Sequence, residues 1–336
     1  MSLYFHYIIM VPILSIFRYE TDNTHGTGCS LSSALASALA LGEQQRNTEN
    51  GDGATSAIDL IDACCLAKSY VAAGIYNSVQ YGKGPGPVAH TMFPSNYQHY
   101  TALTTDPSEE DIAGSFCAMK SYSDTTNDDR PVMARILPVV DTVDWVEKLT
   151  KTPGVTDIQL RIKDEKDPSK VLERCTQCQE ICRAAGIRLW INDHWKAAVD
   201  AGCFGVHVGQ EDLVKCIQSG GIQEMRKRKM ALGISTHSYA ELSTALGMNP
   251  SYISMGPVFA TKSKNVKFKP QGLPIVSKWR QLIPPEMPFV AIGGINDEKL
   301  ARQVRDAGAD SVAVIGAVTK AKDLESTVSS LNDAMV

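Results

Sequence analysis

The stretch DIQLRIK, residues 157–163, decides the fold of the larger part of this 336-residue chain. Its polar and apolar residues alternate strictly, which is the period of a β-strand. We expect Leu160 and Ile162 to face surrounding helices, and Gln159, Arg161 and Lys163 to point into the mouth of a barrel. An arginine and a lysine on the same side of one strand indicate an anion there, because unpaired buried charge is costly. The alternative is an exposed edge strand with solvated charges.

Short runs of residues that favour β-strands recur from residue 134 onward, and helical patterns such as 168–185 and 297–307 lie between them. Eight such runs predict an α/β fold with a parallel sheet, most simply a closed (β/α)8 TIM barrel. A doubly wound open sheet is the structural alternative. The expected strands are Arg135–Val140, Asp157–Ile162, Arg188–Ile191, Gly205–Val208, Ala231–Ile234, Tyr252–Met255, Phe289–Ile292 and Ser311–Ile315.

The composition is that of a globular protein, with 43% hydrophobic and 21% charged residues. These values exclude wholesale disorder and a multi-span membrane protein. A formal charge of -4 gives no reason to expect nucleic acid or a membrane as partner. The nine cysteines are odd in number and lack small-scaffold spacing, which indicates a reducing, cytoplasmic location, with an organelle left open. A homo-oligomer is also left open.

The part of the chain before the barrel has a different pattern. Helical spacing occurs at residues 30–41 and 58–79, and the polar, Gly- and Pro-containing stretch 83–130 shows at most one short helix, at 109–120. The apolar residues 1–17 lack the basic region and cleavage site of a signal peptide, and favour a buried strand or a non-native leader. We therefore divide the chain into a first unit (1–90), a loop-rich linker (91–133) and the barrel (134–336).

Two carboxylates follow neighbouring predicted strands. Asp193 ends the run WIND, and Asp212 follows the run HVGQE. Adjacent strands of a barrel bring these positions within reach of one ion, and carboxylate oxygens together with phosphate oxygens are usual ligands of Mg²⁺. The alternative is that each aspartate caps the helix that follows it.

Polar loops follow the later strands, where barrel enzymes commonly bind phosphate. Hydroxyls, backbone N–H groups and a lysine form the usual phosphate cradle, and glycines let backbone approach an anion. The sequence therefore predicts two anion sites, one assisted by metal and one free of it. His207 is either a substrate contact or a satisfied core histidine. The candidate residues in these loops are Ser235, Thr261, Ser263, Lys264, Gly294, Ile315 and Gly316.

The series QLRIK, INDH, GVHVGQEDL, GISTH, GPVFATKSK, AIGGI and VAVIGA closely resembles thiamine-phosphate synthase over about residues 134–331. That family joins hydroxymethylpyrimidine diphosphate to hydroxyethylthiazole phosphate, releasing pyrophosphate. The resemblance implies a transferase with small phosphorylated substrates, with Mg²⁺ held by Asp193 and Asp212. It also implies catalytic roles for Lys264, Arg161 and Lys163. The implied substrate-binding residues are Gln159, Arg161, Lys163, Asn192, Ser235, Thr261, Ser263, Lys264, Gly294, Ile315 and Gly316.

The sequence departs from the family pattern in three places. Gly316 stands where the family usually has serine, so one hydroxyl contact to the thiazole phosphate is expected to be missing. Ser263 replaces a common threonine and keeps the hydroxyl. Pro138 in the first barrel strand predicts an imperfect strand or a bulge.

The first unit resembles a different family. NTHGTGCS at 23–30, followed by GPGP at 84–87, is similar to the C-terminal portion of hydroxymethylpyrimidine phosphate kinase, a ribokinase-like fold. The resemblance implies an anion hole at Gly26, Gly28 and Cys29. Only residues 1–22 precede this motif, so we expect an incomplete fragment without kinase activity, fused to the synthase. Besides such a fusion, a related thiazole-isomerising barrel is the other functional alternative.

Overall fold

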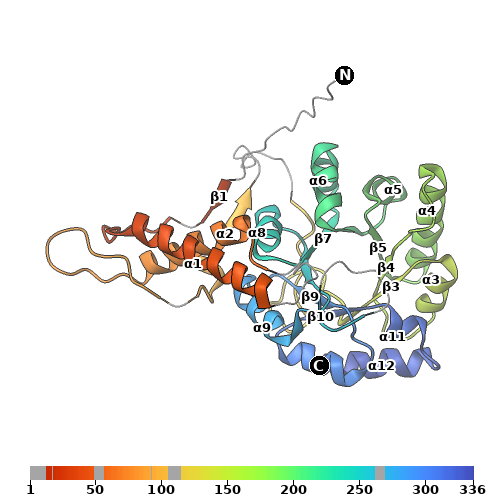
Figure 1. Cartoon of the computed structure of the whole chain (residues 1–336). Helices are drawn as coiled ribbons and strands as arrows, with labels where there is room; N and C mark the ends of the chain where they lie inside the picture. The colour runs from red at the N-terminus through yellow and green to blue at the C-terminus, as the bar shows by residue number, and fades with distance from the viewer. Residues whose placement is uncertain (1–12, 17, 49–56, 92, 105–114, 262–268) are drawn as a thin grey trace.

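Each of the eight apolar runs forms a strand in the computed structural model, and the strands close into one parallel barrel (Figure 1). The structure describes residues 13–16, 18–48, 57–91, 93–104, 115–261 and 269–336. The last strand, β10, pairs with the first barrel strand, β3, so the TIM barrel is confirmed and the open sheet is wrong. The strands are β3 (Ile136–Val140), β4 (Asp157–Leu160), β5 (Arg188–Asn192), β6 (Gly205–Val208), β7 (Ala231–Thr236), β8 (Tyr252–Met255), β9 (Phe289–Ile292) and β10 (Ser311–Val314).

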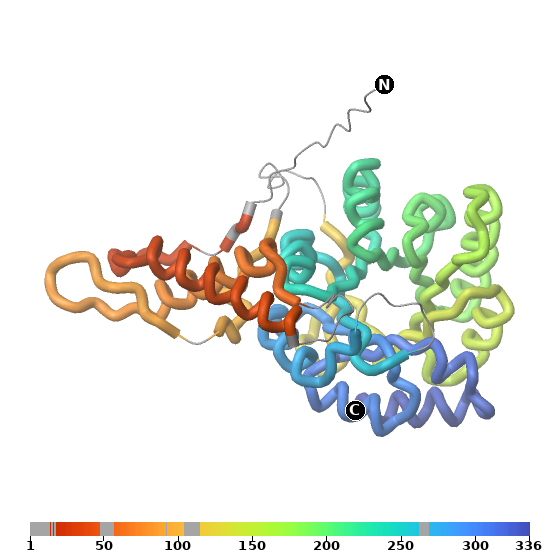
Figure 2. The backbone as a smooth tube through the Cα atoms, in the orientation of Figure 1, coloured from red at the N-terminus to blue at the C-terminus, as the bar shows by residue number. Residues whose placement is uncertain are grey.

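A helix follows each strand of the barrel, and these helices cover the outside of the barrel (Figure 2). Several begin at a residue whose side chain accepts a backbone N–H of the first turn, as Thr142, Ser238 and Asp297 do. The apolar residues between strands and helices form the main core of the chain. The helices are α3 (Val143–Thr150), α4 (Pro168–Ala184), α5 (Trp195–Ala201), α6 (Gln210–Gln218), α7 (Gly221–Lys227), α8 (Tyr239–Met248), α9 (Gly272–Leu282), α10 (Glu298–Asp306), α11 (Gly316–Thr319) and α12 (Leu324–Ala334).

The proline in the first barrel strand does not break it. We expected an imperfect strand or a bulge at Pro138, but β3 runs through this residue and pairs in regular register, Val314 opposite Pro138. All five residues of β3 are buried. The missing proline N–H removes one donor from the ladder, and the packing on both sides of the strand keeps the residue in place.

Residues 116–133, which the sequence assigns to the linker, close the amino-terminal end of the barrel. Met119 and Met133 are 3% and 1% exposed and pack inside the barrel with Leu137 and Trp190. The backbone of Cys117 is held at the start of β7 and β8, by hydrogen bonds with Met230 and Ser251. We call residues 116–133 the floor segment. Residues 115–120 are not helical, and residues 109–114 of the predicted helix lie outside the described residues.

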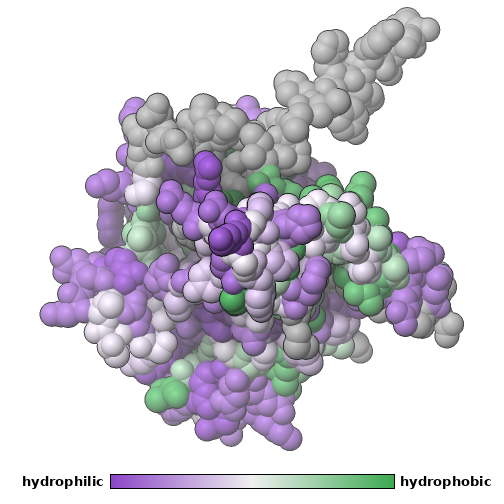
Figure 3. All heavy atoms as spheres, turned by 90° about the vertical axis from the view of Figure 1, so that its left-hand side faces the viewer, coloured by the Kyte–Doolittle hydropathy of each residue, from purple (hydrophilic) through white to green (hydrophobic). Residues whose placement is uncertain are grey.

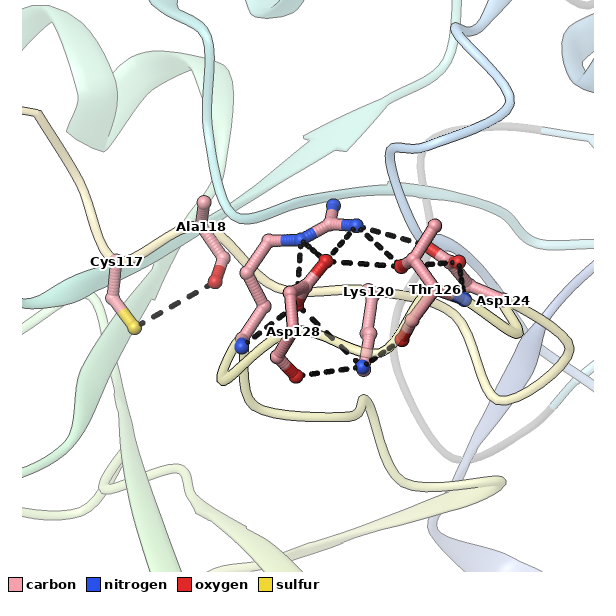
Figure 4. Close-up of polar contacts among 7 residues, drawn as sticks. Cys117, Ala118, Lys120, Asp124, Thr126 and Asp128 are labelled. Carbon is pink, nitrogen blue, oxygen red and sulfur yellow. Dashed lines mark hydrogen bonds and ion pairs between the residues drawn. The ribbon is translucent and has the colours of Figure 1, made fainter.

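The floor segment reverses direction between residues 120 and 130, and a network of charged side chains stabilises this turn (Figure 4). Lys120 Nζ donates to the backbone carbonyls of Thr126, at 2.8 Å, and Asp128, at 2.9 Å. Arg130 pairs with the carboxylates of Asp124, at 3.0 Å, and Asp128, at 2.9 Å. The hydrogen bonds from Arg130 hold the pKa of Asp128 below its ordinary value. The segment is therefore ordered by its own polar groups as well as by its two buried methionines.

The part before the floor segment forms a projecting unit, the described residues between 13 and 104, which we call the N-terminal unit (Figures 1 and 2). Its large hydrophobic side chains are partly left on the surface, where Figure 3 shows green spheres among purple ones; Leu41, Leu60 and Tyr76 are each more than half exposed. None of the helices in the described ranges is long and apolar enough to cross a membrane. The unit comprises β1 (Ile13–Ser15), α1 (Thr27–Thr48), α2 (Leu60–Tyr76), η1 (Tyr97–His99) and β2 (Ala102–Thr104).

Candidate active site

A cavity of about 100 Å³ opens at the carboxyl-terminal end of the barrel strands. In barrels of this kind the active site lies at that end. The side chains that face it come from alternating positions of several strands, as the period of DIQLRIK predicts. Six predicted site residues contribute to its lining, namely Gln159, Arg161, Asn192, Ser235, Thr261 and Ile315.

Polar contacts join the ends of β4 and β5. Gln159 Nε2 donates to Asn192 Oδ1 at 2.8 Å, and both side chains are buried. Asn192 Nδ2 in turn donates to the carboxylate of Asp193. Asp193 has a φ of 65°, the left-handed region that non-glycine residues adopt rarely. This backbone conformation at the end of β5 is a strained feature of the kind that occurs at functional sites.

The charged residues at the mouth act on one another electrostatically. Burial raises the pKa of Asp193, the negative charge of Asp212 raises it further, and the positive charge of Arg161 lowers it. Burial lowers the pKa of Arg161, and Asp193 opposes that shift. Partial desolvation and the charge of Arg161 lower the pKa of Lys163, which lies at the rim and stays in contact with solvent. The structure thus brings two cations and two carboxylates to one side of the barrel mouth.

The two carboxylates are chemically suited to a hard divalent cation. Asp193 and Asp212 raise each other's energy as like charges, and a cation between them would remove that repulsion. Asp212 is one-third exposed and pairs with Lys215 at 2.8 Å, which leaves its second oxygen for another ligand. Among the described residues no group of three or more His, Cys, Asp or Glu has the arrangement of a metal site. The pair therefore fits Mg²⁺ only when phosphate oxygens or water complete the coordination.

The wall of the cavity contains a series of hydrogen-bonded side chains, Tyr252, His207, Ser235 and Ser254. The sequence left the role of His207 open and did not single out Tyr252 or Ser254. The Tyr252 hydroxyl lies 2.8 Å from His207 Nδ1, and His207 Nε2 lies 2.8 Å from Ser235 Oγ. Ser235 Oγ is also 3.4 Å from Ser254 Oγ. Burial raises the pKa of Tyr252 far above its ordinary value, so the phenol stays protonated. His207 is thus a paired histidine inside the barrel that also lines the cavity, and its contact with substrate stays a prediction.

His237 is a further cavity residue, just beyond β7. Glu241 Oε2 accepts hydrogen bonds from His237 N at 2.6 Å and from His237 Nδ1 at 2.9 Å. The side-chain alternation in YISM, residues 252–255, is the signal that points Tyr252 and Ser254 inward. The motif GISTH contains His237, but this residue follows the strand, so the alternation of strand side chains does not predict that it faces the cavity.

The glycines after β9 lie against backbone. Gly293 and Gly294 have φ of 106° and 71°. A Cβ on Gly294 would lie 2.6 Å from Phe259 Cβ, and one on Gly293 would lie 2.6 Å from Pro257 Cα. Close packing against the β8–α9 loop is therefore one reason for these glycines. Gly316 begins α11, directly after Ile315.

The remaining predicted residues are placed as follows. Lys163, Asp193, Asp212, Gly294 and Gly316 lie around the mouth but do not line the cavity itself. Ser263 and Lys264 lie outside the described residues.

The predicted anion hole of the first unit lies at the start of α1. Gly26 has a φ of 87°, and Cys29 is exposed. Both line a separate cavity of about 650 Å³ in the N-terminal unit, whereas Gly28, in the first turn of α1 beside Cys29, does not. This site is distinct from the barrel mouth.

A closed (β/α)8 barrel with cationic, carboxylate and hydroxyl groups around one cavity at its carboxyl-terminal end defines a class of barrel enzymes that bind anionic small molecules.

The comparisons with known proteins narrow this class. Residues 131–318 match the thiamine monophosphate synthase family, and residues 11–89 match the phosphomethylpyrimidine kinase family. Thiamine-phosphate synthase of Rhizobium etli is 43% identical over 187 residues, which are 56% of this chain and 88% of that protein. The enzyme of Citrobacter koseri is 40% identical over 197 residues, 57% of this chain and 88% of that protein.

A solved structure agrees with the sequence comparisons. The structure of thiamine phosphate pyrophosphorylase from Pyrococcus furiosus is similar, with a TM-score of 0.50 and 25% identity over 60% of this chain and 95% of that one. The chain belongs to the thiamine-phosphate synthase family, and it is an enzyme of the transferase class.

Proposed function

We propose that the barrel condenses hydroxymethylpyrimidine diphosphate with hydroxyethylthiazole phosphate, forming thiamine phosphate and pyrophosphate. Family membership supports the reaction. The single observation that carries the mechanism is the position of Arg161, beside the cavity and in electrostatic contact with the Asp193–Asp212 pair.

In the reaction, the bond between the pyrimidine methylene carbon and the diphosphate oxygen breaks, and its electron pair leaves with pyrophosphate. The aminopyrimidine carries the resulting positive charge, and the thiazole nitrogen then forms the new carbon–nitrogen bond. Neither step requires a nucleophile on the protein. What the protein supplies is stabilisation of the departing negative charge and alignment of the two substrates.

We assign the stabilisation of pyrophosphate to Arg161, Lys163 and Lys264. The described geometry supports this for Arg161, which lines the cavity, and for Lys163, which lies at its rim. Thr261, Ser263 and Ser235 supply hydroxyl donors for the same anion. Gln159 and Asn192, fixed by their mutual hydrogen bond, orient the ring of the substrate.

We assign Mg²⁺ to Asp193 and Asp212. When bound there, Mg²⁺ neutralises part of the negative charge of the leaving pyrophosphate. The protein's own contribution is to hold Asp193, directly after β5, and Asp212, in the first turn of α6, on the same side of the mouth. The thiazole phosphate is assigned to the loops after β9 and β10, at Gly294, Ile315 and Gly316.

Turnover by the purified full chain tests this proposal. With both substrates and Mg²⁺, we expect thiamine phosphate and pyrophosphate in equal amounts. Absence of thiamine phosphate would remove the synthase assignment. Conversion of a thiazole substrate offered alone would instead support the isomerase alternative. Phosphorylation of hydroxymethylpyrimidine phosphate in the presence of ATP would contradict the expectation that the N-terminal unit is not an active kinase.

A further inference from the structure

The N-terminal unit packs directly on α8, one of the helices of the barrel (Figure 1). Strand β2 lies so close to α8 that a Cβ on Gly247 would be 2.3 Å from the carbonyl oxygen of Leu103. Leu103 is buried in this contact. The two parts therefore touch through backbone as well as side chains, which fixes the position of the helix relative to the unit.

A carboxylate from the N-terminal unit caps the start of α8. Asp62 Oδ1, on α2, accepts a hydrogen bond from Ala240 N at 2.6 Å. The first N–H groups of a helix have no partner within the helix, and a negative charge near them is stabilising. Asp62 is only 3% exposed, and its second oxygen accepts from Asp59 N within α2.

A second contact holds the same turn. The Tyr100 hydroxyl donates to the carbonyl oxygen of Tyr239 at 2.8 Å, and Tyr100 is 5% exposed. Asp62 and Tyr100 thus fix consecutive residues, Ala240 and Tyr239, in the first turn of α8. The two contacts come from separate segments of the N-terminal unit, α2 and the residues between η1 and β2.

The first turn of α8 also holds a residue of the active-site cavity. Glu241 follows Ala240 directly and accepts hydrogen bonds from both the backbone N–H and the Nδ1 of His237. The His237 imidazole lines the cavity. A short path therefore runs from Asp62 to the cavity wall: a hydrogen bond joins Asp62 to Ala240, the backbone joins Ala240 to Glu241, and hydrogen bonds join Glu241 to His237.

From these contacts we infer that Asp62 is a positioning residue for the synthase site. It holds the first turn of α8, and that turn holds the His237 side chain at the wall of the substrate cavity. The N-terminal unit has a role in the barrel reaction that is separate from any kinase chemistry. The turnover part of the test below rests on the proposed function, whereas its spectroscopic part does not.

Asp62→Ala removes the cap and should release His237. We expect KM for at least one of the two substrates to rise roughly threefold to tenfold while kcat changes less than about twofold, the pattern of lost binding. Asp62→Asn keeps an oxygen that accepts from Ala240 N, and we expect near wild-type constants. Asp59→Ala is the matched control, because Asp59 caps α2 through Asp62 N, at 2.7 Å, without a contact to α8.

A double variant separates positioning from general loosening of the fold. If Asp62 acts through His237, Asp62→Ala adds nothing to the effect of His237→Ala on KM. Additive effects, or an Asp62→Ala enzyme with unchanged KM, would overturn the inference. Circular dichroism and thermal unfolding of each variant serve to check that the fold is retained.

The NMR signals of the His237 imidazole give a readout that does not depend on activity. The His237→Ala spectrum assigns them among the 7 histidines. We expect them to move in Asp62→Ala and to stay in place in Asp62→Asn and Asp59→Ala; unmoved signals in Asp62→Ala would contradict the inference. Should Asp62→Ala not fold, Tyr100→Phe, which removes the hydroxyl that donates to Tyr239, carries the same test. A wild-type chain without turnover would refute the proposed function and still leave this spectroscopic test decisive.

Discussion

Arg161 is the residue on which the chemistry of the mouth depends most. It lines the cavity, it is half-buried, and Asp193 stabilises its positive charge against the cost of that burial. A guanidinium in this setting interacts more strongly with an anion than one in water does, since less solvent screens it.

Arg161→Met keeps the length of the side chain and removes its charge. We expect kcat/KM to fall by about 100-fold or more, the usual result of removing one preorganised donor for developing charge. Arg174→Met is the control: Arg174 is also arginine, but it lies on α4 and pairs with Asp164 at the surface. If steady-state kinetics show equal losses in the two variants, the special role of Arg161 is wrong.

Lys163 should give the reaction a pH dependence. Burial and the neighbouring Arg161 lower the pKa of Lys163, so its ammonium loses the proton at a lower pH than an ordinary lysine, whose value is 10.5. Attraction for pyrophosphate should weaken as pH rises through that lowered pKa, and kcat/KM should fall there. In Arg161→Met one of the two causes is gone, and we expect this alkaline limb to move to higher pH. The assignment would be contradicted if the alkaline fall of kcat/KM occurred at the same pH in Arg161→Met as in the wild type. It would also be contradicted if this fall persisted in Lys163→Arg.

At the scale of the element, the floor segment shows how a stretch without regular secondary structure is held. Lys120 is buried, and its ammonium replaces the hydrogen bonds that two carbonyl oxygens of the turn would make with water. Met119 and Met133 extend from the two arms of this turn into the barrel.

Lys120→Met should open this turn. Leaving the carbonyls of Thr126 and Asp128 without their donor should lower the free energy of unfolding by about 1–3 kcal/mol. Denaturant unfolding measures this change. Lys322→Met, at an exposed position two residues before α12, is the comparison, and it should stay within about 0.5 kcal/mol of the wild type. A Lys120→Met protein as stable as the wild type would show that the methionines alone hold the segment.

The barrel strands can be predicted from the sequence because each is an apolar run between polar turns. The alternation in DIQLRIK likewise predicts which side Gln159 and Arg161 face, and both line the cavity. The floor segment cannot be predicted in this way, because Met119 and Met133 are isolated apolar residues in a polar stretch and have no periodicity.

Contacts between residues on different strands and helices cannot be predicted from periodicity either. In the sequence Tyr252 resembles the other apolar residues of its strand. Its hydroxyl is nevertheless paired with His207, which lies two strands earlier in the chain. The cap of Asp62 on α8 joins residues 178 positions apart. Sequence spacing carries no information on such pairs, since only the closed barrel and the packing of its helices bring them together.

At the scale of the whole molecule, two parts with different family resemblance share one interface. Residues 11–89 match the phosphomethylpyrimidine kinase family and residues 131–318 the thiamine monophosphate synthase family. The division of the chain at 90 and at 133 stays a prediction. The structure adds that β2 and α2 pack on α8, and that residues just before 134 contribute to the interior of the barrel.

Gly247→Ala should disturb this interface. The added methyl group would lie 2.3 Å from the backbone of Leu103, so β2 must move away from α8. Overpacking of this kind costs about 1–3 kcal/mol. We expect a lower unfolding temperature and faster proteolysis of the N-terminal unit. Gly84→Ala, where nothing lies within 4 Å of the added carbon, should change neither.

Calorimetric titration of the full chain with pyrophosphate tests most directly whether the mouth of the barrel binds the leaving group. We predict binding in the presence of Mg²⁺, binding at least about tenfold weaker when the metal is removed, and a similar loss in Asp212→Ala. Asp200→Ala, an exposed carboxylate on α5, should bind as the wild type does. Pyrophosphate affinity that is indifferent both to Mg²⁺ and to Asp212 would contradict the account.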